Sequence, residues 1–65
     1  MRNNLKEIRE KENYSQLKLS YETRIASTDI SSIERGKKFP YPGWRKKLAA
    51  ALDVKEEEIF PGINE

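Results

Sequence analysis

The chain has 65 residues and a net charge of +2, with 13 Lys or Arg, 11 Asp or Glu, and neither His nor Cys. A chain of this length forms at most one domain, here residues 1–65, and a large catalytic cleft is not expected. Without Cys or His it lacks disulfides, thiolate chemistry, the commonest acid/base group and most zinc sites, so we expect no cofactor and no metal. No apolar run is long enough for a membrane span or a signal peptide, and a small protein without disulfides suits the cytoplasm.

The first part of the chain predicts two short helices. Residues 5–12 carry apolar side chains three positions apart among good helix formers, and Asn3 or Asn4 can cap this segment. Ser15 is a suitable N-terminal cap for a second helix over residues 16–22.

Residues 23–26 contain few helix formers and predict a turn before a third helix over residues 27–35. This helix has Ile30 and Ile33 on one face, hydroxyl side chains on the other, and Gly36 as a C-terminal stop. Its four Ser or Thr residues lower its helix propensity, because their side chains compete for backbone hydrogen bonds. A reason other than helix formation is therefore expected for this composition.

Two more helices are predicted after a loop over residues 37–43 that contains two prolines. One begins at residue 42 or 43 and ends at residue 52, and the other covers residues 55–60. Acidic side chains in the first turn of the last helix suit its dipole. Because no strand-like alternation occurs, the sequence predicts an all-α fold.

Residues 16–35 have the pattern of a helix-turn-helix. Two short helices flank a tight turn, and Ser20 allows them to approach closely. Ile25, Ile30 and Ile33 would lock the pair together. In this motif the second helix enters the major groove, where short hydroxyl side chains would let the backbone lie close to DNA. A plain helical hairpin would have the same pattern, and it remains the alternative at this point.

Charge is distributed unevenly along the chain. Residues 1–34 have a net charge of 0, residues 35–52 have +6, and residues 53–65 have −4. A central block of one sign indicates a polyanionic partner such as nucleic acid. A solvated basic surface without a partner is the alternative.

Several stretches resemble a known family. They are the string Ile-Ser-Ser-Ile-Glu-Arg-Gly-Lys at 30–37, which is the most specific, and residues 4–9, 14–16, 48–52 and 59–60. Together they resemble the Cro/phage-repressor-type helix-turn-helix family over residues 2–61 without a gap. The resemblance implies a five-helix lambda-repressor-like domain that binds double-stranded operator DNA through the helix at 27–35, as a sequence-specific transcriptional regulator and repressor.

The resemblance also implies roles for individual residues. Ser27, Thr28 and Ser32 match the residues that contact bases in the major groove. Arg9 and Glu34 match a structural ion pair, which makes Glu34 a scaffold residue. Contacts to the DNA backbone are implied for Gln16, Arg35, Lys37, Lys38, Tyr41 and Trp44, with Arg45, Lys46 and Lys47 as weaker candidates of which some must point away.

The chain departs from the family pattern at three positions in its turns and caps. Arg24 stands in the turn where Gly is common, and a left-handed conformation there costs about 1–2 kcal/mol. Ala26 stands where Ser or Thr usually caps the third helix, and Asp53 replaces another frequent Gly.

Asp29 can satisfy free amides in the first helical turn or accept a hydrogen bond from cytosine, and we expect the capping role.

A protein-interaction module with the same fold, such as an antitoxin or anti-repressor, is the alternative function. Leu17 and Tyr21 stand at positions that are usually polar, and they are either a contact surface or scattered exposed residues. An enzyme would have to use the acidic residues 56–58, whose side chains diverge on a helix, so no enzymatic activity is expected. We expect a weak homodimer or a dimer formed on DNA, through the last helix and residues 60–63.

Overall fold

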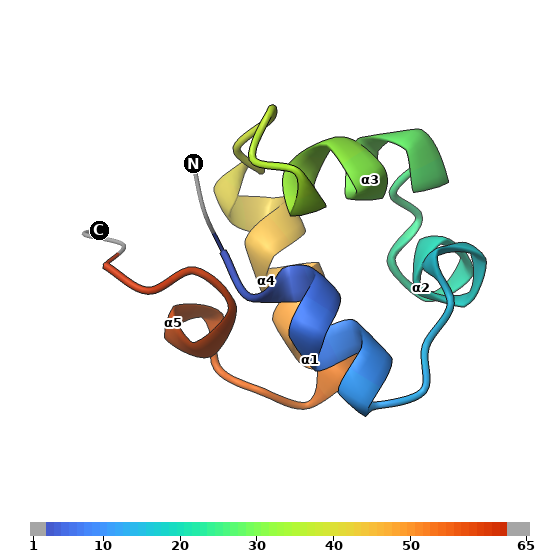
Figure 1. Ribbon diagram of the computed structural model, residues 1–65, viewed down its shortest axis with the longest axis horizontal. Helices are drawn as coiled ribbons and strands as arrows, with labels where there is room; N and C mark the ends of the chain where they lie inside the picture. The colour runs from blue at the N-terminus through green and yellow to red at the C-terminus, as the bar shows by residue number, and fades with distance from the viewer. Residues whose placement is uncertain (1–2, 63–65) are drawn as a thin grey trace.

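The computed structural model describes residues 3–62, and in that range the chain forms five helices and no strand (Figure 1). The helices are α1 (Leu5–Lys11), α2 (Gln16–Thr23), α3 (Ser27–Glu34), α4 (Pro42–Leu52) and α5 (Glu56–Ile59). The predicted all-α class is confirmed, and each predicted helix end lies within one residue of the observed one. Ile63, part of the expected dimer surface, lies outside the described residues.

Local hydrogen bonds explain where the helices begin and end. The Ser15 hydroxyl accepts a hydrogen bond from the Lys18 amide at 3.0 Å and caps α2, as predicted. After α3, Gly36 is left-handed with φ 75°, and the amide of Lys37 donates to the Ser32 carbonyl at 2.9 Å. Together with the bond from the Gly36 amide to the Ile33 carbonyl at 3.0 Å, this contact stops the helix at its C-terminus.

The core takes apolar side chains from every helix. Its buried members are Leu5, Leu19, Ile25, Ile30, Ile33, Leu48, Ala49, Leu52, Ile59 and Phe60. Burying each large apolar side chain contributes roughly 1.5–3 kcal/mol to folding. Because Ile25, Ile30 and Ile33 all lie in this core, the turn and α3 are held against the rest of the molecule.

The arrangement leaves one long side of α3 uncovered. In Figure 1, α3 lies along the upper edge of the molecule, with α2 at one end and the α3–α4 loop at the other. The acidic helix α5 lies on the far side of α1 and α4 from α2. No helix within residues 3–62 has the length and apolar character that crossing a membrane requires.

Candidate nucleic-acid interface

The turn between α2 and α3 is fixed by buried hydrogen bonds. The Thr23 hydroxyl donates to the Leu19 carbonyl at 2.7 Å and accepts from the Ile25 amide at 3.3 Å. Arg24, between these residues, adopts the left-handed conformation with φ 62°, where glycine would be unstrained. The chain therefore keeps the left-handed turn although Arg replaces the glycine.

Helix α3 presents its hydroxyl groups on the side opposite its isoleucines. Thr28 is exposed, Ser27 and Ser32 are half-buried, and Ile30 and Ile33 are fully buried. Thr28 and Ser32 are four residues apart and therefore lie on one face of the helix. Ser27, Thr28 and Ser32, for which base contacts are expected, thus lie on α3 and are not part of the buried core. Ala26 occupies the N-cap position and supplies no side-chain cap, yet the helix still begins at Ser27.

Glu34 joins α3 to the two helices before it. Its carboxylate accepts hydrogen bonds from Arg9 Nε at 2.6 Å and from Gln16 Nε2 at 3.0 Å, and Arg9 Nη1 donates to the Tyr14 carbonyl at 2.7 Å. The side chains of Arg9 and Glu34 are only 9% and 4% exposed. Gln16, for which a DNA contact is expected, donates one amide hydrogen to Glu34 and keeps the second for another acceptor.

A second cluster joins the start of α3 to the α3–α4 loop and to α4. Lys38 Nζ lies 3.0 Å from Asp29 Oδ1 and 5.1 Å from the centre of the Trp44 ring, and Tyr41 packs edge-on against Trp44 at 5.2 Å. The expectation that Asp29 caps α3 is wrong, because its carboxylate turns to Lys38 instead of a backbone amide. Lys38 and Trp44, both expected at the DNA backbone, contact each other.

The basic block at 35–52 divides into exposed and internally paired cations. Arg35, Lys37, Lys46 and Lys47 are exposed. Arg45 is buried, donates to the Pro40 carbonyl at 3.1 Å and to Glu56 at 3.3 Å, and lies over the Phe39 ring. Arg45 is therefore the weaker candidate that points away, and it connects α4 to α5. The sequence held no signal for this pairing, because Glu56 lies beyond the end of α4.

Leu17 and Tyr21 form a separate apolar surface on α2. Their side chains are 61% and 76% exposed, and together with Ser20, Arg24, Ile25 and Ala26 they line a hollow beside the turn. Arg24 supplies the charge at this surface. Within the described part of the chain, no group of three or more acidic, His or Cys side chains could hold a metal ion.

Comparison with known proteins agrees with this geometry. A family model described as a helix-turn-helix domain matches residues 3–65. No curated protein matches the chain. The model covers almost the entire chain, and the matched segment holds the two short helices, the left-handed turn and the exposed second helix described above. The chain therefore belongs to the helix-turn-helix domain family, a family of DNA-binding regulatory domains.

Proposed function

We propose that the chain is a Cro/repressor-like, sequence-specific regulator of transcription that folds as a single lambda-repressor-like domain over residues 1–65. The observation that carries this proposal is that α3 has an exposed polar side. The helix itself is held in place because Glu34 contacts α1 and α2. A rigid helix with short hydroxyl side chains can enter the major groove closely and offer both donors and acceptors to base edges. Ser27, Thr28 and Ser32 are the proposed base contacts.

The DNA backbone would be contacted on both sides of α3. Arg35 and Lys37 follow the helix and are exposed, and Tyr41 and Trp44 stand at the start of α4, whose free amides and dipole favour phosphate. Gln16 uses only part of its donor capacity inside the protein, so it is also a proposed contact. Lys38 is paired with Asp29 and is therefore left out of the proposed phosphate contacts. These contacts would fix the register of α3, and the hydroxyl groups would supply specificity.

Repression requires only that the bound protein occupies its operator. We propose that this occurs in the cytoplasm and that two copies bind paired half-sites, as a weak homodimer or as a dimer formed on DNA. An enzymatic activity forms no part of this proposal. Double-stranded DNA is the proposed partner.

Selection of bound duplexes from a random library tests the proposal. The expected result is a two-fold symmetric motif whose half-sites are separated by about one helical turn. A library that yields no enriched motif would contradict sequence-specific binding.

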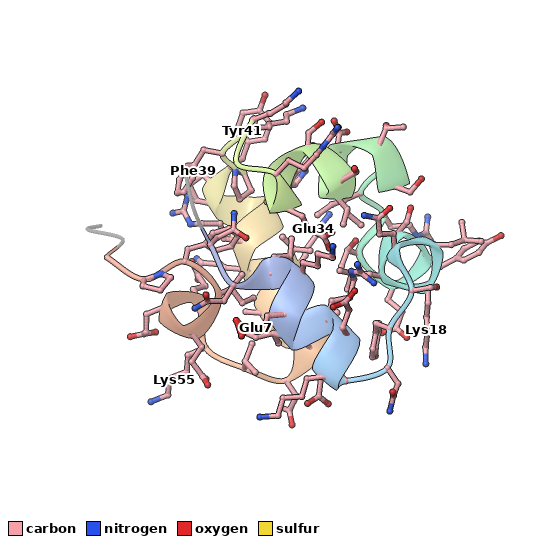
Figure 2. The ribbon with its side chains drawn as sticks, viewed as in Figure 1. Glu7, Lys18, Glu34, Phe39, Tyr41 and Lys55 are labelled. Carbon is pink, nitrogen blue, oxygen red and sulfur yellow. The ribbon has the colours of Figure 1, made fainter. Side chains whose placement is uncertain are left out.

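A matched pair of variants distinguishes the loss of a DNA-backbone contact from the loss of one positive charge. Lys37→Gln and Lys55→Gln remove the same charge, but Lys37 follows α3, whereas Lys55 lies near α5, far from Tyr41 (Figure 2). We expect Lys37→Gln to weaken binding to all duplexes and Lys55→Gln to have little effect. Equal losses would show that overall charge alone determines binding.

A protein-interaction module such as an antitoxin or anti-repressor is the second candidate, and the exposed Leu17 and Tyr21 favour it. The double variant Leu17→Ala/Tyr21→Ala lies outside the proposed DNA contacts, so operator binding should be unchanged. If this variant still binds DNA but loses its regulatory effect in cells, the apolar surface is required for function. Unchanged regulation would leave DNA binding as the sufficient activity.

A further inference from the structure

Asp29 borders the side of α3 that is proposed to contact bases. It follows Thr28 directly and precedes Ser32 by three positions, so its side chain neighbours that of Ser32 on the helix surface. The carboxylate is one-third exposed, and Lys38 contacts one of its two oxygens, Oδ1. Within residues 3–62 no hydrogen bond is found for Oδ2. Lys38 therefore holds one acceptor oxygen, and the other remains able to accept a hydrogen bond.

An acidic side chain at this place needs a physical reason, because DNA phosphates repel it. A partly exposed ion pair contributes little to stability, so the Asp29–Lys38 pair is not explained by folding. Lys38 does offset the negative charge of Asp29. Its ammonium is in turn positioned by the Trp44 ring, against which Tyr41 packs. The cluster therefore holds a compensated carboxylate at the edge of the proposed interface.

We propose that Asp29 is a further specificity-determining residue, which accepts a hydrogen bond from the exocyclic amine of a cytosine in the major groove. Cytosine presents N4 there as a donor, and carboxylates accept from it. Lys38 is a positioning residue that orients and neutralises this carboxylate. The inference rests on the proposed function and adds one base position to the contacts of Ser27, Thr28 and Ser32.

Selection from a random duplex library tests this role with the intact chain and four variants. The wild-type motif should contain a cytosine at one position of each half-site. Asp29→Ala should lower the preference for that cytosine by about fivefold to tenfold, the lower part of the range for one base contact, and leave other positions unchanged. Lys38→Met should weaken the same preference, and Lys38→Arg should keep it because Arg retains the positive charge.

Lys37→Met is the matched control, because Lys37 is the exposed neighbour of Lys38. It should lower affinity for all duplexes without changing the motif. Trp44 is the sole tryptophan of the chain, so its fluorescence reports on the cluster in the free protein. Asp29→Ala and Lys38→Met should both change its emission, and Lys37→Met should not.

The outcomes separate this inference from the proposed function. If the wild type enriches no motif, the proposed function itself fails. If the wild type enriches a motif that Asp29→Ala leaves unchanged at every position, the base contact of Asp29 is overturned. If Trp44 emission is the same in the wild type, Asp29→Ala and Lys38→Met, the positioning role of Lys38 is overturned.

Discussion

Replacing Glu34 by Gln tests the contact that joins three helices. The substitution keeps the shape of the side chain but removes the negative charge that Arg9 faces at 2.6 Å. The amide oxygen can still accept from Arg9 Nε, but an amide nitrogen in place of Oε1 cannot accept from Gln16 Nε2 or Arg9 Nη2, which donate to Oε1 at 3.0 and 3.4 Å. Arg9 keeps its bond to the Tyr14 carbonyl. The variant therefore leaves a nearly buried guanidinium without its counter-ion.

The expected loss follows from this burial. Removing one partner of a fully buried ion pair costs about 3–5 kcal/mol. Because one acceptor oxygen and the Tyr14 contact remain, we expect about 2–3 kcal/mol for Glu34→Gln. A domain of this size has a total stability of about 3–10 kcal/mol. The loss should lower the melting temperature by roughly 10–20 °C.

Urea unfolding followed by circular dichroism measures this loss. Glu7→Gln is the matched control, because Glu7 is exposed on α1 (Figure 2), and its effect should stay within about 0.5 kcal/mol. The double variant Arg9→Met/Glu34→Met should be more stable than Arg9→Met alone, because no unpaired charge remains. The reasoning is refuted if Glu34→Gln unfolds at the same urea concentration as the control.

Three further predictions concern local structure. Arg24→Gly should raise the free energy of unfolding by about 0.5–1 kcal/mol in urea titrations, because the relief of left-handed strain exceeds the added chain entropy; a loss would mean that the Arg24 side chain stabilises the turn. Ser15→Ala should cost about 1 kcal/mol by removing the cap of α2, and Ser15→Gly only a few tenths. The hydrogen bond from the Tyr14 hydroxyl to Glu22 raises the pKa of Tyr14 above its ordinary value of 10.0. This bond therefore stabilises the fold below about pH 10, and the stabilisation is lost as the pH rises through the folded-state pKa of Tyr14. The stability difference between the wild type and Tyr14→Phe should therefore shrink above about pH 10, and a constant difference would argue against this bond.

Local signals made the helices and the turn predictable. The Ser15 cap, the stop at Gly36 and the isoleucines of α3 each act within one or two turns of the chain, so the sequence pattern contains the relevant partners. The left-handed turn persisted at Arg24 because Thr23 and the buried Ile25 fix the backbone on both sides. Local constraints of this kind outweigh the conformational preference of Arg against the left-handed region.

The side-chain pairs of the site were less predictable, because they depend on how loops bring distant residues together. Asp29 was expected to cap α3, but the loop after the helix returns Lys38 to its first turn. Arg45 stands among exposed cations in the sequence, and its burial follows from the docking of α5, which brings Glu56 to it. In the composition, Lys38 and Arg45 both count as positive charges available to a partner. In the fold, Lys38 is paired with Asp29 and Arg45 with Glu56.

The internal pairing of Lys38 and Arg45 limits how many cations of the basic block can neutralise DNA phosphates, and this number sets the expected salt dependence of DNA binding. Of the six cations in residues 35–52, Lys38 and Arg45 are paired internally, and Arg35, Lys37, Lys46 and Lys47 remain exposed. Each neutralised phosphate contributes about −0.9 to the slope of log K against log salt, so at most four contacts from this block give about −3.6 per protomer. Titration of a selected duplex at several salt concentrations measures the slope, and Lys38→Met should leave it unchanged while Lys37→Met makes it shallower by about 0.9. A loss of about 0.9 in the slope on replacing Lys38 would show that Lys38 neutralises a phosphate and would contradict its assignment as the counter-ion of Asp29.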